Sequence, residues 1–467
     1  MSVSVASCSL KQLFSGDCIY SSNGKPIQGE LAIPEYQRPY RWRVPQISSL
    51  LKDYREFLLE KKHTPELPFY MGSVIFHQEE KSASLNIIDG QQRLTTLALI
   101  AFMQGQHLQL NLSFKSPESQ QQILHNLHWL NKNKEYLSIL EFGDINLTIV
   151  VTKSEDDAYR FFETQNTGGV RLAGPDIIKA HHLRAIEKSK QSRFASLWEG
   201  LGDLNPVVDG LIKGRHWQDL NFRQVPSHRQ PQLVRDVIVT ELAEQTRQGK
   251  DVGYGRIIRT FHSDGSQLYQ QPQQGYELRQ PLNAGINTVH YLAYFEGLRA
   301  TYLSGKTSDL TEFHTFYNEL ITKLDGCSYL KSLYDTCLLL YLSQFGEQEL
   351  YIASRKLFRV VYSPRLSNQK SVRELSISSF LRDTPVLDWI AHSYTPQMCF
   401  DYLDQFVLRV DPANLQNEIN SVKKRFVLDV CKFFSLKVDP NELAEQFSQK
   451  LDQEIKGFTL ESLVNVE

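Results

Sequence analysis

The segment from Asn86 to Leu97, with the sequence Asn-Ile-Ile-Asp-Gly-Gln-Gln-Arg-Leu-Thr-Thr-Leu, restricts the fold of this chain more than any other. Its first residues are branched and apolar, as in a strand, and the Asp-Gly pair that follows is a strong turn signal. Leu94 and Leu97 then recur at helical spacing. The pattern predicts a strand that runs through a tight turn into a helix, whose unpaired first N–H groups can build an anion site.

The length of 467 residues exceeds that of one ordinary core and predicts two or three domains. Hydrophobic residues make up 41% and charged residues 22%, as in folded soluble proteins. The apolar run from Leu94 to Met103 is about half the length that a bilayer requires, and no secretory signal is visible. Six cysteines occur without a Cys-x-x-Cys pair, which favours reduced thiols. We therefore predict a cytoplasmic protein with no membrane association.

The net charge of −2 and the isoelectric point of about 6.7 do not indicate a chain-wide nucleic-acid surface. One stretch, residues 354–374, is locally basic and has aromatic residues among its charges. It has two interpretations, a solvated helix face with its loop or a contact with DNA. In the second interpretation, the DNA-binding residues are Arg355, Lys356, Arg359 and Arg365.

The start of the predicted helix carries side chains that fit either capping or phosphate binding. Asp89 is placed to cap the helix, and Gln92 falls three residues later, where a capping-box partner belongs. Capping alone explains these two residues but requires nothing of Gln91 or Arg93. A guanidinium beside free helix N–H groups suits a phosphate, so both interpretations stay open.

A second polar cluster extends from Ile33 to Trp42 and combines two prolines, three aromatic residues, two arginines and Gln37. Prolines stiffen the backbone, so such a segment can hold a phosphate or a base edge at little entropic cost. The alternative is a polar loop that covers a hydrophobic groove through Tyr36 and Trp42.

The remaining pattern predicts a mixed N-terminal domain and a helical C-terminal half, an α+β chain. Strands are expected at residues 74–76, 85–88 and 145–151, and helices at 45–58, 154–162 and 175–183. Beyond about residue 190 the periodic segments are helical, for example 313–345 and 412–434, while 245–282 is predicted as a long loop. The helical period of Pro175 to Lys179 predicts that Asp176 and Lys179 are surface or domain-packing residues.

Together, Ile33–Trp42 and Ile88–Leu97 resemble the DGQQR-motif family typified by the N-terminal domain of GmrSD modification-dependent restriction enzymes. A third element, Phe161–Leu172, is similar to the Asn-x-x-Gly segment of that family. The resemblance covers residues 10–190 and implies a ParB/sulfiredoxin-like nucleotide-binding domain there. Residues 191–467 would then form a helical region that binds DNA or a partner.

The resemblance also implies a site for a nucleoside triphosphate and Mg²⁺, without distinguishing GTP, ATP and CTP. The nucleotide would be bound by Tyr36, Gln37, Arg38, Gly90, Gln91, Gln92, Arg93 and Asn166. Asp89 would orient water or the metal ion, and Asp89, Gln92 and Arg93 would be the catalytic residues, with Arg93 stabilising the transferred phosphoryl group.

The nuclease partner of such systems resembles an HNH protein, and this chain departs from that pattern. His392 is the nearest match, and no suitable His-Asn set follows it. We therefore expect a separate HNH-type nuclease subunit, with DNA, modified or not, as the target. The predicted function is a nucleotide-binding and nucleotide-hydrolysing subunit of a prokaryotic anti-phage or modification-dependent restriction system. The alternatives are a non-catalytic sensing adaptor and a complete nuclease with a diverged metal site. Whether two copies associate is left open.

Overall fold

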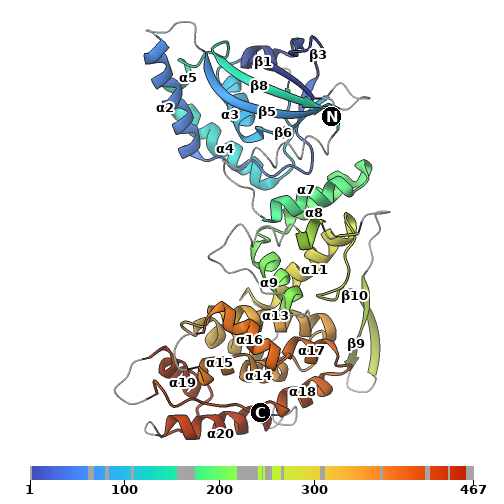
Figure 1. Ribbon diagram of the computed structural model, residues 1–467, viewed down its shortest axis with the longest axis vertical. Helices are drawn as coiled ribbons and strands as arrows, with labels where there is room; N and C mark the ends of the chain where they lie inside the picture. Colours follow the sequence, from blue (N-terminus) through green and yellow to red (C-terminus); the bar gives the residue numbers. More distant parts are fainter. Residues whose placement is uncertain are drawn as a thin grey trace. The chain divides into compact units, whose positions relative to one another are not determined.

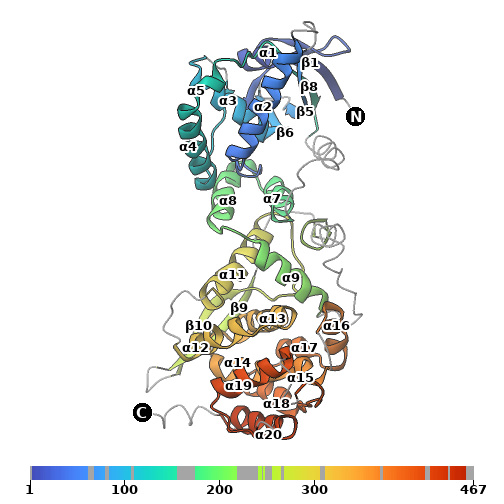
Figure 2. The same ribbon diagram turned by 90° about the vertical axis from the view of Figure 1, so that its left-hand side faces the viewer.

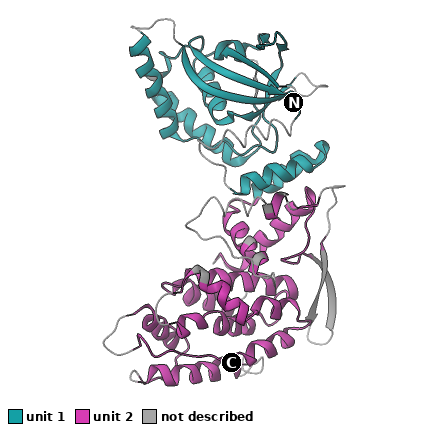
Figure 3. Cartoon of the chain, in the orientation of Figure 1, with its two compact units in different colours: residues 1–200 teal, residues 201–467 magenta. Residues whose placement is uncertain are grey.

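The computed structural model describes residues 3–61, 68–78, 84–106, 110–154, 174–217, 240–244, 246–247, 255–263, 268–304, 311–368, 372–415, 421–439 and 442–458. The chain divides into two compact units, residues 1–200 (unit 1) and residues 201–467 (unit 2), drawn in different colours in Figure 3. Each unit is described by itself below.

Unit 1 is a mixed α+β domain. Its strands are β1 (Val3–Ser9), β2 (Ile19–Tyr20), β3 (Pro26–Ile27), β4 (Glu30–Ala32), β5 (Phe69–Gln78), β6 (Ser84–Asp89), β7 (Leu110–Asn111) and β8 (Ile145–Thr152). Its helices are α1 (Leu10–Ser15), α2 (Val44–Lys61), α3 (Gln91–Met103), α4 (Pro117–Lys132), α5 (Lys134–Leu137), α7 (Gly174–Ala185) and α8 (Lys188–Gly200). The strands and helices expected at 74–76, 85–88, 145–151, 45–58 and 175–183 are confirmed.

Six strands of unit 1 form one sheet in the order β1-β8-β5-β6-β4-β7 (Figure 1). The β1–β8 and β5–β6 pairs are antiparallel, whereas β8–β5, β6–β4 and β4–β7 are parallel. Strand β6, which ends at Asp89, therefore lies inside the sheet between β5 and β4. The Asp89-Gly90 turn follows at the end of this strand. The predicted mixed N-terminal domain is confirmed.

The core of unit 1 lies between one face of the sheet and helices α2 and α3 (Figures 1 and 2). Alternate strand residues enter this core because neighbouring side chains on a strand point to opposite faces. From the sheet it takes Val74, Phe76, Leu85, Ile87, Leu147 and Ile149, and from the helices Ile47, Leu50, Leu51, Tyr54, Leu94, Leu97, Ile100 and Ala101. Burial of this apolar face fixes α3 against the sheet, so the start of α3 has a defined position.

Within its described residues, unit 2 consists of helices and a β-hairpin. The helices are α9 (Asn205–Trp217), α11 (Ile286–Tyr302), α12 (Thr311–Glu319), α13 (Ser328–Phe345), α14 (Leu350–Val361), α15 (Ser363–Ser367), α16 (Glu374–Asp383), α17 (Val386–Ala391), α18 (Pro396–Gln405), α19 (Val422–Phe433) and α20 (Leu443–Lys456). Short π and 3₁₀ turns lie at Thr240–Glu244 and Ile321–Lys323. The mainly helical C-terminal region is thereby confirmed.

The loop expected at 245–282 is a wrong prediction for part of that range. Strands β9 (Arg256–Ser263) and β10 (Leu268–Gly275) pair there as an antiparallel hairpin. The segment is rich in Gln and poor in aliphatic residues, so it lacks the alternation that identifies a half-buried strand. The helix expected over 313–345 is also interrupted, by the 3₁₀ turn between α12 and α13.

The basic stretch near residue 360 is internal to unit 2. The exposed fractions of Arg355, Lys356, Arg359 and Arg365 are 3%, 4%, 2% and 4%. The first three form ion pairs with Glu454, Asp404 and Asp452 at 2.7, 2.7 and 2.6 Å, and Arg365 donates to the carbonyl of Gly326. This corrects both expectations for the segment, since neither a solvated face nor a DNA contact fits buried, paired side chains.

No helix among the residues described is both long and apolar enough to span a bilayer. All six cysteines are free thiols, and Cys8, Cys327, Cys337 and Cys399 are buried.

Candidate functional site

The turn between β6 and α3 is built around a left-handed glycine. Gly90 is the N-cap residue of α3 with a φ of 91°, and the helix receives no side-chain cap. A Cβ at this position would lie 2.5 Å from Cγ1 of Val74, so only glycine fits without displacement. The expectation that Asp89 caps α3 is therefore wrong, because the left-handed residue stands between the carboxylate and the helix start.

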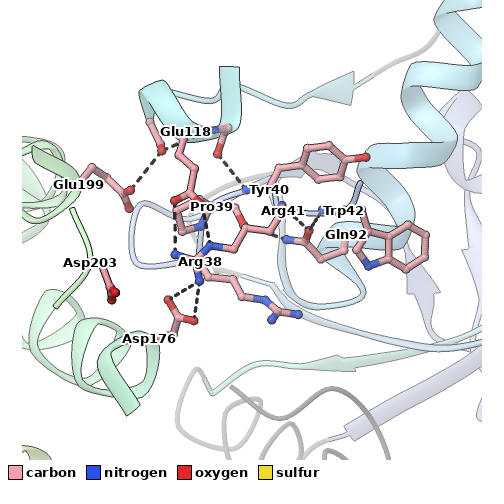
Figure 4. Close-up of polar contacts among 12 residues, drawn as sticks. Arg38, Pro39, Tyr40, Arg41, Trp42, Gln92, Glu118, Asp176, Glu199 and Asp203 are labelled. Atoms are coloured by element: carbon pink, nitrogen blue, oxygen red, sulfur yellow. Dashed lines mark hydrogen bonds and ion pairs between the residues drawn. The ribbon is translucent and has the colours of Figure 1, made fainter. Parts of the chain in front are cut away.

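Gln91 and Gln92 bind the main chain of the segment 38–42. The Gln92 side chain donates to the carbonyl of Pro39 at 3.0 Å and accepts from the N–H groups of Arg41 and Trp42 at 2.8 and 3.2 Å. Gln91 donates to the carbonyl of Arg38 at 3.0 Å. Figure 4 shows the amide of Gln92 facing this segment. The two amides thus hold the polar cluster of residues 33–42 against α3 through backbone atoms alone.

Arg93 binds the main chain of β5. Its Nη1 and Nη2 atoms donate to the carbonyls of Met71 and Ser73 at 2.8 and 2.7 Å, where β5 is irregular between Tyr70 and Ser73. Gly72 lies between the two carbonyls with a φ of 91°, and a Cβ there would lie 2.7 Å from Nη1 of Arg93. The guanidinium therefore fixes a distorted part of the sheet.

The two clusters meet in space. Gln37 donates from Nε2 to the carbonyl of Ile88 at 3.0 Å, one residue before the Asp-Gly turn. Tyr40 is fully buried, and its hydroxyl lies 2.8 Å from the Thr96 hydroxyl and accepts from Asn126 at 3.1 Å. Residues 36–38 therefore lie beside the start of α3, through Gln37 at Ile88 and through Arg38 at Gln91. The expected convergence with residues 89–93 does not extend to Arg93, whose guanidinium is bound to β5.

A cavity of about 220 Å³ opens beside this junction and is called the Arg38 cavity here. It is lined by Ile33, Pro34, Glu35, Gln37, Arg38, Pro39, Gln91, Ser113, Phe114, Lys115, Ser116, Pro117, Ser119, Lys179, Ala195, Ser196, Glu199 and Gly200. Three of the expected nucleotide-binding residues, Gln37, Arg38 and Gln91, are in this lining. Gln92 and Arg93 are not.

The charged groups around the Arg38 cavity are unequally paired. Lys115 contacts Glu35 and donates to the Ser192 hydroxyl at 2.7 Å. Lys179 contacts Glu199 and donates to the carbonyl of Gln37 at 2.8 Å. The guanidinium of Arg38, by contrast, makes no hydrogen bond or ion pair with any residue that the structure describes. Burial lowers the pKa of Arg38, and the carboxylate of Asp176 partly offsets this.

Gln91 also presents an unsatisfied atom at the wall of the cavity. Its Oε1 is buried and has no hydrogen-bond partner within the described part of the chain, although its Nε2 is bonded. A buried carbonyl oxygen without a donor is costly, so a donor from outside the described chain, a water molecule or a ligand group, is expected at this atom. That group would be a donor, such as a ring N–H, an amino group or a hydroxyl.

Arg41 connects the 38–42 segment to helices α7 and α4. The Arg41 guanidinium donates to Asp176 of α7 at 3.1 Å and to Glu118 of α4 at 2.9 Å, and it lies between the two carboxylates in Figure 4. Burial raises the pKa of Asp176, and Arg41 opposes this rise. Of the two α7 residues expected at a surface or domain contact, Lys179 is 2% exposed and lines the cavity. The signal that could have identified it is the four-residue spacing of Lys179 from Leu183, which places both on one face of the helix.

The remaining predicted residues have other surroundings. Tyr36 is 5% exposed and is not in the cavity lining. Asn166, the Asn-x-x-Gly segment and the helix expected at 154–162 lie outside the described residues, apart from Ser154. Asp89 lies 3.4 Å from Nη2 of Arg93. Within the described ranges, no group of three His, Cys, Asp or Glu residues is placed to hold a metal ion.

Comparison with known proteins gives two family matches. Residues 19–183 match the family described as GmrSD restriction endonuclease, N-terminal domain. Residues 190–419 match a family described as one of unknown function, DUF7834. No curated protein matches the chain significantly. The first match contains both polar clusters, and the whole Arg38 cavity lies within it except for the lining residues on α8.

Proposed function

Because residues 19–183 of this chain are a GmrSD restriction endonuclease N-terminal domain, we propose that the chain binds a nucleotide in the Arg38 cavity as part of a phage-defence restriction system. In this role the bound nucleotide sets the state of the protein, and DNA is the target of the system. The second match, to a family of unknown function, adds no activity to this proposal.

The observation that carries the proposal is the pairing of an unsatisfied cation with an unsatisfied acceptor at one cavity. Arg38 has a free guanidinium fork, which suits a phosphate. Gln91 Oε1 requires a donor, which a phosphate at neutral pH supplies poorly and a base edge or a ribose hydroxyl supplies well. A nucleotide carries both kinds of group, so it fits this cavity better than a simple anion does.

Two lysines add positive charge to the lining of the same cavity. Lys115 and Lys179 line the cavity with Arg38, and Glu35 and Glu199 oppose them. Three cations against two carboxylates leave a net positive lining, which favours an anionic ligand. Hydroxyl groups of Ser113, Ser116, Ser119 and Ser196 add further hydrogen-bonding groups around the cavity.

Nucleotide hydrolysis by Asp89, Gln92 and Arg93 has less support than binding does. Both Nη atoms of Arg93 are used by β5 carbonyls, and the amide of Gln92 is used by the 38–42 segment. These residues are therefore better described as the frame of the site. Any charge stabilisation of a phosphoryl group in the cavity would come from Arg38, Lys115 or Lys179.

The restriction role also requires a nuclease. We propose a separate HNH-type subunit for this step, since the sequence lacks the HNH pattern, and we propose that nucleotide binding controls its recruitment. A second copy of the chain is not required for this scheme.

The test is calorimetric titration of the full chain with GTP, ATP and CTP in magnesium buffer, with phosphate release measured on the same samples. At least one nucleotide should bind, and Arg38→Ala should weaken it by about 10-fold or more, as expected for a charge-assisted bond. Arg43→Ala is the matched control, because Arg43 is exposed and outside the cavity. Absence of binding, or equal affinity of wild type and Arg38→Ala, would refute the proposal.

A further inference from the structure

Unit 2 contains a larger cavity that belongs to the family match of unknown function. Its volume is about 780 Å³, within the roughly 300–1,000 Å³ typical of small-ligand sites. It is formed where α15, α16, α17 and α18 meet, and it is lined by Ser363, Ser367, Phe380, Asp383, Thr384, Trp389, Tyr402, Gln405, Phe406, Val407 and Arg409. We call it the Trp389 cavity.

The walls of the Trp389 cavity are aromatic. Trp389 on α17 and Tyr402 on α18 lie nearly parallel, with ring centroids 6.5 Å apart and an interplanar angle of 14°. Both rings are partly exposed, as are Phe380 and Phe406. Partly exposed, parallel rings offer flat faces on which another aromatic ring can stack. Scattered exposed aromatic residues are ordinary, but four that line one cavity form a stacking surface.

Two hydroxyl groups, on residues that are largely buried, line the same cavity. Ser363 and Thr384 are 5% and 7% exposed, and both line the cavity. Neither hydroxyl is hydrogen-bonded to any residue in the described part of the chain. Hydroxyls that line a cavity without a protein partner are available to a ligand with polar edge groups. Because each hydroxyl both donates and accepts, the pair suits the mixed donors and acceptors at the edge of a heterocycle.

The rim carries charged and polar groups. Arg409, Asp383 and Gln405 are exposed and have no side-chain partner among the residues described. A free guanidinium beside a stacking surface can bind a phosphate. Aromatic faces, hydroxyl groups and one cationic group at the rim correspond to the parts of one nucleotide. An apolar peptide would match the rings but would offer no polar group to the two hydroxyls or to Arg409.

We propose that the Trp389 cavity binds a single unstacked nucleotide of a DNA strand. The base stacks on Trp389 and Tyr402, its polar edge bonds Ser363 and Thr384, and the flanking phosphate contacts Arg409. This inference rests on the proposed restriction function, because that function makes DNA the ligand. It adds a site in unit 2 that is separate in sequence and role from the Arg38 cavity.

The test measures binding of the full chain to two fluorescent duplexes by anisotropy, one fully paired and one with a single-base bulge. The wild type should prefer the bulged duplex, because the cost of unstacking that base is already met. Trp389→Ala should weaken bulge binding by about 5-fold or more and remove the preference, and Trp389→Phe should retain it. Tyr394→Ala is the matched control, since Tyr394 is 90% exposed and outside the cavity.

Salt dependence tests the phosphate contact. Arg409→Ala should lower the slope of log affinity against log salt concentration by about one, while Arg382→Ala, at an exposed arginine outside the cavity, should not. A bulge preference that survives Trp389→Ala would overturn the proposal. So would displacement of the bulged duplex by mononucleotides at comparable concentration, because the cavity would then take free nucleotides.

Failure of this inference can be told apart from failure of the proposed function. Arg38→Ala should lose nucleotide affinity and keep the bulge preference, whereas Trp389→Ala should do the reverse. Loss of both properties in either variant, with an unchanged melting temperature, would contradict the assignment of two sites.

Discussion

Replacement of Gln92 by alanine tests whether this residue frames the site or performs chemistry in it. The Gln92 side chain makes three hydrogen bonds to the main chain at Pro39, Arg41 and Trp42, and it is 6% exposed. A net contribution of about 0.5–1.5 kcal/mol for each bond gives a loss of roughly 2–4 kcal/mol. For a unit of this size each kcal/mol lowers the melting temperature by about 2–4 °C. We therefore expect Gln92→Ala to lower the melting temperature of unit 1 by about 4–16 °C.

Hydrogen exchange reports on the loop itself and is independent of unit 2. The amide hydrogens of Arg41 and Trp42 are donated to Gln92 Oε1, so both should exchange faster in Gln92→Ala. Gln121→Ala, at an exposed position of α4, is the matched control and should change neither quantity. If Gln92→Ala melts like the wild type and its loop amides exchange at the wild-type rate, the framing role is refuted.

Three further predictions follow from contacts described above. Gly90→Ala should lower the free energy of unfolding by about 1–3 kcal/mol more than Gly105→Ala does in denaturant titrations. Both glycines have a positive φ, but only at Gly90 would a Cβ clash with a neighbouring side chain. Equal losses in the two variants would contradict this. Arg359→Ala should cost about 3 kcal/mol, because it removes a buried guanidinium that bonds Asp452 and the carbonyls of Leu403 and Phe406. The salt dependence of DNA binding should be unchanged, and a reduced salt slope would restore a DNA role. Burial raises the pKa of Cys399 to about 12, so its thiolate fraction is very low at neutral and mildly alkaline pH. Alkylation followed by mass spectrometry should label exposed Cys18 first and Cys399 only after unfolding. Early labelling of Cys399 would contradict its burial.

Local patterns in the sequence were sufficient for the elements that carry the site. The apolar spacing of Leu94 and Leu97 and the break at Asp89-Gly90 predicted the end of β6 and the start of α3. These features depend on neighbours within a few residues, which is the range over which periodicity and turn chemistry act.

The partners of the polar side chains could not be predicted in the same way. The spacing of Gln92 indicates a capping residue, yet its side chain is hydrogen-bonded to main-chain atoms of residues 50 to 53 positions earlier in the sequence. The position of Arg93 at a helix start indicates an anion-binding residue, yet its guanidinium donates to main-chain carbonyls in an irregular stretch of β5. A glutamine or an arginine has the same local pattern in both roles, and only the tertiary fold decides which acceptors are within reach.

The basic helix α14 illustrates the same limit for charge. Lys356 and Arg359 follow the spacing of a solvated face, but their carboxylate partners come from α18 and α20, 48 and 93 residues later. Since the sequence signal for a solvated helix and for a helix in buried ion pairs is the same, burial could not be predicted there.

The side-chain amides of Gln91 and Gln92 bind the 38–42 segment only through its backbone N–H and carbonyl groups, which do not depend on the side chains of that segment. The shape of that loop is consequently independent of the side chain displayed at position 38. A protein engineer can exchange Arg38 for another residue and keep the architecture around it. If Arg38 binds the nucleotide as proposed, a substitution there would change affinity for the ligand without changing the fold.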